Sequence, residues 1–354
     1  MKESTIANDT DRSSEKKVYL EICRIMAIFC IMYQHTGGRG ADAWQYTGSS
    51  LVYAVSMTGM IISCIGVPLF WMISGALLLS RQESWKKVYG RRMPRIAAVL
   101  VIFSIIRYVY QCITNGQAGS VGAFLKQFCT KEIFLPYWFL YEYLGILLIL
   151  PFLKKIVQNL TQQEKQLLFG LILGWNVLND IFKIGMGTGF MIGFSFPSSI
   201  YYFMLGYLLE NCGVLRKNDR KGLWCHIGCA LFVTVCLFVW MHAEHGIGPL
   251  VYAAEGSLGM FLTTAVYYVV RYLDEKSRKS NMVLQRFVLW CGKNVFGLYL
   301  IEDYLRNGLT VIWEFLGPRI NTIPACAVWL TAVFLTGNVL IAGARRLPLF
   351  RKIL

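Results

Sequence analysis

Charged residues are scarce in this sequence, and acidic residues are the scarcest of them. Only 16% of the 354 residues are charged, with 20 Asp and Glu against 35 Lys and Arg, whereas 56% are hydrophobic. A soluble domain of this size cannot bury so much apolar surface, so the composition indicates a membrane protein. The net charge of +15 would suit a nucleic-acid partner. Because the basic residues lie between apolar runs, we expect no nucleic-acid binding.

Several motifs that carry chemistry are also missing. The chain has no Cys-x-x-Cys, no Gly-x-Ser-x-Gly, no Walker A sequence and no dinucleotide fingerprint in a strand context. The 11 cysteines fall mostly inside apolar runs, which predicts small buried side chains and no disulfide framework. His242, Glu244 and His245 share a short outer loop, which is too exposed to favour a metal site. We therefore expect no metal and no permanently bound cofactor.

Long apolar stretches dominate the rest of the chain. Ten are long enough to cross about 30 Å of hydrocarbon, which takes about 20 residues each. The second stretch contains Gly66 and Pro68, which predict a kink or a partly re-entrant segment. The fold class we predict is all-α: a polytopic membrane helical bundle with about ten transmembrane helices. Their approximate centres are Ala27, Val67, Ile102, Gly145, Leu173, Leu205, Val233, Met260, Leu300 and Val333.

The loops between these stretches orient the bundle. With ten spans and the N-terminus inside, 27 of the 35 Lys and Arg fall in inner segments and 6 in outer ones. This asymmetry fits the positive-inside rule and predicts an N-in, C-in protein of the plasma membrane. Residues 1–17 form a polar cytoplasmic tail without the features of a signal peptide, residues 18–346 the membrane domain, and residues 347–354 a cytoplasmic C-terminal tail.

The first apolar stretch carries two ionisable residues, Arg24 and His35. They are eleven positions apart, so on a helix they face within about 20° of each other and lie about 16 Å apart along its axis. Glu21 lies one turn before Arg24 on the same side. Ionisable residues at membrane depth are costly and indicate function. The alternative is that Arg24 reaches the inner surface and pairs with Glu21, while His35 only ends the helix.

Five segments resemble one family in order along the chain. They are the Arg24-x10-His35 spacing, residues 67–79 (VPLFWMISGALLL), residues 91–95 (RRMPR), residues 137–141 (YWFLY) and residues 292–301 (GKNVFGLYLI). Together, over about residues 18 to 345, they resemble the acyltransferase 3 family of bacterial integral-membrane O-acyltransferases. The family often carries a His where this chain has Glu302, a departure that concerns the acceptor end of the site.

The resemblance implies an enzyme, an O-acetyltransferase that takes acetyl-coenzyme A, or another acyl-coenzyme A, as donor substrate. His35 would be the catalytic base, and Arg24, with Glu21 beside it, would assist donor binding. Arg91, Arg92 and Arg95 offer cations for the phosphates of coenzyme A, although such a cluster is also an ordinary inner-surface anchor.

Ser74 is the remaining residue expected at the donor. It could donate a hydrogen bond to the thioester or act as a transient nucleophile, while the alternative for the Ser-Gly pair is close helix packing.

Another group of residues is expected at the channel or acceptor site. Trp138 and Tyr141 would line it, although an interfacial aromatic belt explains them equally well. Glu142 lies within an apolar stretch and needs a partner, for which Arg107 is one candidate. Glu302 and Arg306 are four residues apart and could simply neutralise each other. The members expected at this site are Trp138, Tyr141, Glu142, Tyr299 and Glu302.

These observations predict an acyl transfer across the membrane. The acceptor class comes from the resemblance and is a hydroxyl of an extracytoplasmic or lipid-linked cell-surface carbohydrate, as in polysaccharide O-acetylation of the cell envelope. The expected partners are therefore membrane lipid, acyl-coenzyme A and a glycan. The rival prediction is an exporter of a small polar metabolite, in which the same Arg, Glu and His form a substrate or proton path. A third is a membrane sensor, which would not need the Arg24–His35 register.

Overall fold

The structure, a computed structural model, describes residues 18–116, 118–186, 197–212, 220–277 and 282–353. The polar tail predicted at residues 1–17 lies outside them. Every regular element of the described residues is a helix, as predicted. The α-helices are α2 (Val18–Gln34), α3 (Ser50–Ser63), α4 (Gly66–Leu78), α5 (Trp85–Lys87), α6 (Met93–Thr114), α7 (Val121–Thr130), α8 (Trp138–Asn159), α9 (Gln162–Met186), α10 (Ser198–Asn211), α11 (Arg220–Glu244), α12 (Gly248–Glu255), α13 (Ser257–Ser277), α14 (Met282–Gly308), α15 (Thr310–Ile320), α16 (Thr322–Ala344) and α17 (Pro348–Ile353). Short helical turns lie at η1 (Gly37–Arg39), η2 (Ala43–Gln45), η3 (Val88–Arg92) and η4 (Leu135–Tyr137).

Each of the ten predicted centres falls within one of these helices. In the described part of the chain, four helical segments are long and apolar enough to cross a membrane: Ser50–Leu78, Trp85–Thr114, Arg220–Glu244 and Thr322–Ala344. A fifth is possible if α7 and the segment Leu135–Asn159, which meet at 56°, form one bent span. The others are short, as α2 is with its 17 residues, or carry several charges, as α14 does. The count of ten crossings and the N-in, C-in orientation stay predictions.

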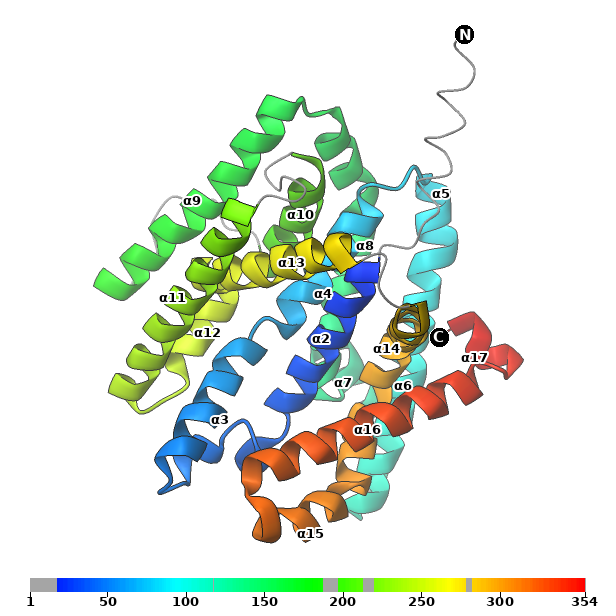
Figure 1. Ribbon diagram of the computed structural model, residues 1–354. Coiled ribbons are helices and arrows are strands. Elements are labelled where there is room, and N and C mark those ends of the chain that lie inside the picture. The colour runs from blue at the N-terminus through cyan, green and yellow to red at the C-terminus, as the bar shows by residue number, and fades with distance from the viewer. Residues whose placement is uncertain (1–17, 117, 187–196, 213–219, 278–281, 354) are drawn as a thin grey trace.

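Helix α2 occupies the centre of the bundle (Figure 1). It packs against α4, α14, α3, α13 and α16. Its N-terminal half, with Leu20 and Cys23, belongs to one buried apolar cluster, and its C-terminal half, with Ile28 and Met32, belongs to a second. One of the first backbone N–H groups of the helix finds an acceptor on α13, since Tyr19 N donates to Oδ2 of Asp274 at 3.2 Å. Contacts with both apolar clusters and the hydrogen bond to α13 therefore fix the position of α2.

The closest helix contact joins α4 to α10. A Cβ added to Gly75 would lie 1.7 Å from the carbonyl oxygen of Phe203, and one added to Gly206 would lie 1.9 Å from that of Met72. Only glycine permits backbones to approach this closely, as in many membrane helix pairs. The Ser-Gly pair of the second stretch therefore serves packing through its glycine, which leaves the role of Ser74 to be decided separately.

This contact predicts a large difference between two glycine substitutions. Gly206→Ala should destabilise the protein by about 1–3 kcal/mol, because the added methyl group meets backbone atoms that cannot rotate away. Gly228→Ala is the matched control, since a Cβ there meets nothing within 4 Å. Thermal unfolding of both purified variants in detergent compares them. Equal melting temperatures would contradict the close approach of α4 and α10.

Candidate active site

The imidazole of His35 and the carboxylate of Glu302 are in contact across the bundle. Nδ1 of His35 lies 2.6 Å from Oε1 of Glu302. His35 directly follows the last residue of α2, and Glu302 lies in the C-terminal part of α14. The side chain of Glu302 is 2% exposed and that of His35 is 28% exposed. A buried carboxylate thus lies behind an imidazole that is still accessible.

This contact decides which ring nitrogen is the basic one. An ionised carboxylate only accepts hydrogen bonds, so Nδ1 of a neutral His35 carries the proton and donates it to Glu302. Nε2 is then unprotonated and can take a proton from a substrate. The carboxylate also favours the imidazolium that such a transfer creates. The pair has the geometry of a general base and its orienting residue.

Further charges lie behind Glu302 on α14 and α6. Nε of Arg306 lies 3.5 Å from Oε2 of Glu302, so the predicted pair four residues apart exists but is longer than the contact to His35. Neutralisation by Arg306 alone therefore does not describe Glu302. Asp303 joins the network, because its two oxygens accept hydrogen bonds of 2.7 Å from Arg107 and from Arg306. Burial makes these partners necessary, since an unpaired ion here would be costly.

A polar cavity of about 300 Å³ lies between α2, α4, α6, α8 and α14. We call it the inner cavity. Its charged lining side chains are Glu21, Arg24, Arg92, Arg95 and Lys293. Its remaining walls are mainly aromatic and aliphatic and include Phe70, Ser74, Phe139, Tyr143, Phe296 and Tyr299. Four cations against one carboxylate make the inner cavity suited to an anionic ligand.

Arg24 faces the inner cavity, and Glu21 holds it there. Nη1 of Arg24 donates to Oε1 of Glu21 at 2.6 Å. The backbone of Gly292 on α14 gives this carboxylate its room, since a Cβ at that position would lie 2.2 Å from Oε2. The predicted Arg24–Glu21 pair is therefore present, and it forms part of the wall of the inner cavity.

The three arginines of the basic run do not share one position. Arg92 and Arg95 line the inner cavity, whereas Arg91 does not. Nε of Arg95 donates to the carbonyl oxygen of Ile353 on α17 at 3.1 Å, and Nε of Arg92 donates to Oε2 of Glu83 at 2.6 Å. The expected role of Arg91 in donor binding stays a prediction, and its side chain is exposed.

Glu83 is a residue that the sequence did not single out. Its side chain is only 3% exposed, and its carboxylate also lies 3.3 Å from Nζ of Lys87. Burial alone would raise the pKa of Glu83, but the hydrogen bonds and charges of Arg92 and Lys87 outweigh it and hold the pKa below its ordinary value. The ionised carboxylate positions Arg92 at the cavity. The only feature of the sequence that could have indicated this role is that Glu83 is an acidic residue in a basic segment.

On α8, the residues that line the inner cavity differ from those predicted at the channel or acceptor site. Trp138, Tyr141 and Glu142 do not line the inner cavity, whereas Phe139 and Tyr143 do. The hydroxyl of Tyr141 instead donates to the carbonyl oxygen of Phe128 at 3.0 Å. Residues 139, 143 and 147 follow the spacing of four that marks one helix face. An aromatic-rich sequence does not reveal which of its faces turns inward.

The suggested partner of Glu142 was wrong. Arg107 pairs with Asp303, at 2.7 Å, and not with Glu142. The side chain of Glu142 has Ser199 of α10 as a hydrogen-bond partner. Ser74 does line the inner cavity, where it is a hydrogen-bond partner of Tyr143.

Helices α2 and α14 connect the inner cavity to the His35–Glu302 pair. The two helices pack against each other. Tyr299, which lines the inner cavity, precedes Glu302 by three residues, so both lie on one side of α14. On the side of α2, Arg24 lines the inner cavity and His35, just after the helix, contacts Glu302. A cation-lined cavity and a base with its carboxylate therefore lie along the same pair of helices.

Comparison with known proteins gave one match. Residues 17–343 match the model of a protein family described as an acyltransferase domain. No curated protein and no solved structure matches the chain. The match covers nearly the whole chain, including both the inner cavity and the His35–Glu302 pair.

The ion pair between Arg107 and Asp303 makes a testable contribution to stability. Asp303→Asn should lower the free energy of unfolding by about 3 kcal/mol, because it leaves Arg107 and Arg306 buried with a weaker partner. The double variant Arg107→Met/Asp303→Leu removes both charges and should recover part of the loss. Arg319→Gln, on an exposed side chain, is the control. Thermal unfolding in detergent measures all three, and an unchanged Asp303→Asn variant would contradict the network.

Proposed function

Because the chain belongs to the acyltransferase 3 family of membrane acyltransferases, we propose that it is an O-acyltransferase acting across the plasma membrane. The donor is cytoplasmic acyl-coenzyme A, and the group transferred is acetyl. The acceptor is a hydroxyl of an extracytoplasmic or lipid-linked carbohydrate of the cell envelope. The observation that carries the proposal is the 2.6 Å contact between His35 and Glu302.

The inner cavity supports the choice of donor. Coenzyme A carries phosphates, and Arg92, Arg95 and Lys293 offer cations at the end of the site that the positive-inside rule places toward the cytoplasm. The aromatic walls suit the thin pantetheine arm. On α2, Arg24 and His35 lie about 16 Å apart along the helix axis, a separation that an extended arm can cover. The thioester then lies near His35 while the phosphates stay at the inner cavity.

The reaction follows from the position of the base. Nε2 of His35 takes the proton of the acceptor hydroxyl while that oxygen forms a bond to the thioester carbonyl carbon. The tetrahedral intermediate collapses with cleavage of the carbon–sulfur bond. The departing thiolate of coenzyme A takes the proton back from Nε2. Glu302 accepts the hydrogen bond from Nδ1 throughout and stabilises the transient imidazolium.

In this mechanism the acyl group passes directly to the acceptor. Ser74 lines the inner cavity, on the donor side of the site, and is hydrogen-bonded to Tyr143. That position suits contact with the donor and gives Ser74 no histidine partner of the kind a serine nucleophile needs.

Removing the base or its orienting residue tests the proposal. His35→Ala should lower acyl transfer by about 10²- to 10⁴-fold, since proton abstraction is lost. Glu302→Gln should lower it by at least about 10²-fold, because the amide no longer favours the productive tautomer or the imidazolium. Consumption of acetyl-coenzyme A by purified protein in lipid, with an envelope glycan fraction as acceptor, measures both.

Glu314→Gln is the matched control for Glu302→Gln, because Glu314 lies on the neighbouring helix α15 but is 54% exposed. The control should keep parental activity. Full activity of His35→Ala would overturn the assignment of the base. Vectorial movement of a metabolite without consumption of acetyl-coenzyme A would instead favour the exporter. Chemical comparison of surface glycans from deletion and parent strains identifies the acceptor.

The arginines give a second test, directed at donor binding. Arg95→Gln should raise KM for acetyl-coenzyme A about 10-fold or more and leave kcat nearly unchanged, since one charged contact to a phosphate is lost. Arg91→Gln is the matched control, because Arg91 is also exposed and lies one helical turn away but does not line the inner cavity. Equal KM values for the two variants would place the phosphates elsewhere.

A further inference from the structure

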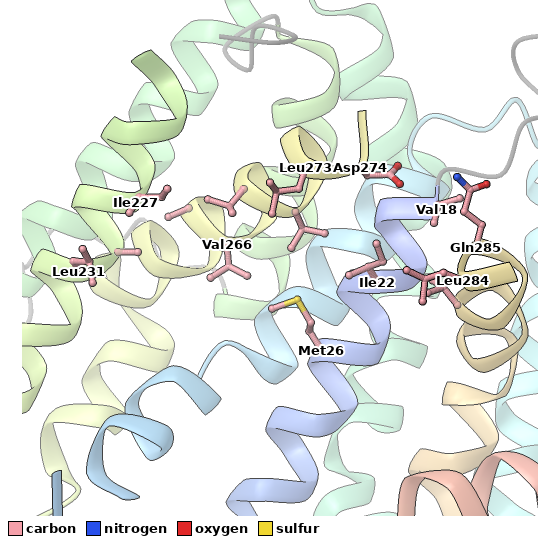
Figure 2. A pocket seen from close by; sticks show the side chains of 15 residues that line it. Val18, Ile22, Met26, Ile227, Leu231, Val266, Leu273, Asp274, Leu284 and Gln285 are labelled. Atoms are coloured by element: carbon pink, nitrogen blue, oxygen red, sulfur yellow. The ribbon is translucent and has the colours of Figure 1, made fainter. Parts of the chain in front are cut away.

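A second and larger cavity lies on another face of α2. Its volume is about 640 Å³, and 13 of its 15 lining residues are apolar. Figure 2 shows Val18, Ile22 and Met26 of α2 on one side and Ile227 and Leu231 of α11 on the other. Helix α13 and the start of α14 complete the wall. We call it the apolar cavity, and neither the base nor the arginines of the candidate active site line it.

The apolar cavity lies beside the N-terminal halves of α2, α11 and α14 and beside the middle and C-terminal part of α13. It meets α2 and α14 near their first residues, at Val18 and Leu284, and α13 near its last, at Asp274. On α11 it begins two turns after the first residue. With the orientation that the positive-inside rule predicts, this depth is the cytoplasmic leaflet. An acceptor sugar on the outer side is therefore at the wrong depth to occupy it.

Exposed basic residues lie near the lining residues along α11, α13 and α14. Lys276 follows Asp274 by two residues, and Arg286 directly follows Gln285. Arg220 precedes Ile227 by seven residues, so the two side chains share one face of α11 about 10 Å apart. Asp274, the one acidic residue of the wall, accepts the hydrogen bond of Tyr19 N and thereby caps α2, and Glu275 lies 3.4 Å from Arg271. The charge available at the rim is therefore mainly positive.

We propose that the apolar cavity binds an anionic phospholipid of the cytoplasmic leaflet. One acyl chain fills the cavity, where an empty space would forfeit the dispersion contacts of its lining. The phosphate of the headgroup lies near Arg220, Lys276 and Arg286, as basic residues at this surface attract anionic lipids. The bound lipid supports α2 on a different face from the one that lines the inner cavity, and it stabilises the protein whatever reaction it catalyses.

Lipid selectivity of thermal unfolding tests this site. Full-length protein in detergent is titrated with dioleoyl phosphatidylglycerol or with dioleoyl phosphatidylcholine, which have the same acyl chains. Phosphatidylglycerol should raise the melting temperature by several degrees more, and native mass spectrometry should show one retained molecule. Equal shifts with both lipids would overturn the proposal. So would an equal shift with soluble glycerol phosphate, since that probe lacks an acyl chain.

Two kinds of variant separate the cavity from its rim. Ala230→Trp fills the cavity and should abolish the selective shift, whereas Phe232→Trp, on an exposed residue of the same helix outside the lining, should keep it. The triple variant Arg220→Gln/Lys276→Gln/Arg286→Gln should weaken the apparent affinity for phosphatidylglycerol about 10- to 100-fold.

A control triple removes the same charge elsewhere. Arg346→Gln/Arg351→Gln/Lys352→Gln, at exposed positions near the C-terminus, should keep the selective shift. Retention of the shift in either Ala230→Trp or the rim triple would contradict the site. Because the rim residues are exposed, their triple variant tests the proposal even where Ala230→Trp does not fold.

Discussion

An ion inside an apolar bundle needs a partner, and the site of this protein depends on that requirement. Glu302 is almost completely buried, and its closest partner is the imidazole of His35 at 2.6 Å. Arg306, Asp303 and Arg107 continue the pairing toward α6. Each of these ions would be costly to bury alone. The ion pairs together therefore fix the distances between α2, α6 and α14. The same pairing leaves Nε2 of His35 as the basic atom.

Helix α2 joins the separate parts of the molecule. One face carries Glu21 and Arg24 in the wall of the inner cavity, and another carries Val18, Ile22 and Met26 in the wall of the apolar cavity. Its length is shared by the two buried apolar clusters. A change in the position of α2 therefore affects the base, the cation-lined cavity and the apolar cavity together. This 17-residue helix thus carries Arg24 and Glu21 in the wall of one cavity and leads directly into His35.

At the inner cavity, neighbouring residues of one sequence motif have different surroundings. Gly75 belongs to the contact with α10, whereas its neighbour Ser74 points into the cavity. Arg92 and Arg95 reach the cavity and Arg91 does not, although all three come from one basic run. Buried Glu83 holds Arg92 in its position. A run of similar residues thus becomes a site only through the directions in which the helix points them.

The sequence by itself determined the all-helical class and the helix around each predicted centre, and it singled out Arg24 and His35 as candidate functional residues. These follow from local properties. Long apolar runs form helices in lipid, and ionisable residues within such runs are costly and therefore indicate a function. The tertiary structure alone decided that Glu302 faces His35, that Phe139 and Tyr143 line the inner cavity, and that Arg107 pairs with Asp303. Contacts between residues as far apart as 35 and 302 depend on how helices are placed and rotated against each other. That rotation is set by the packing of all of them, which no single segment encodes.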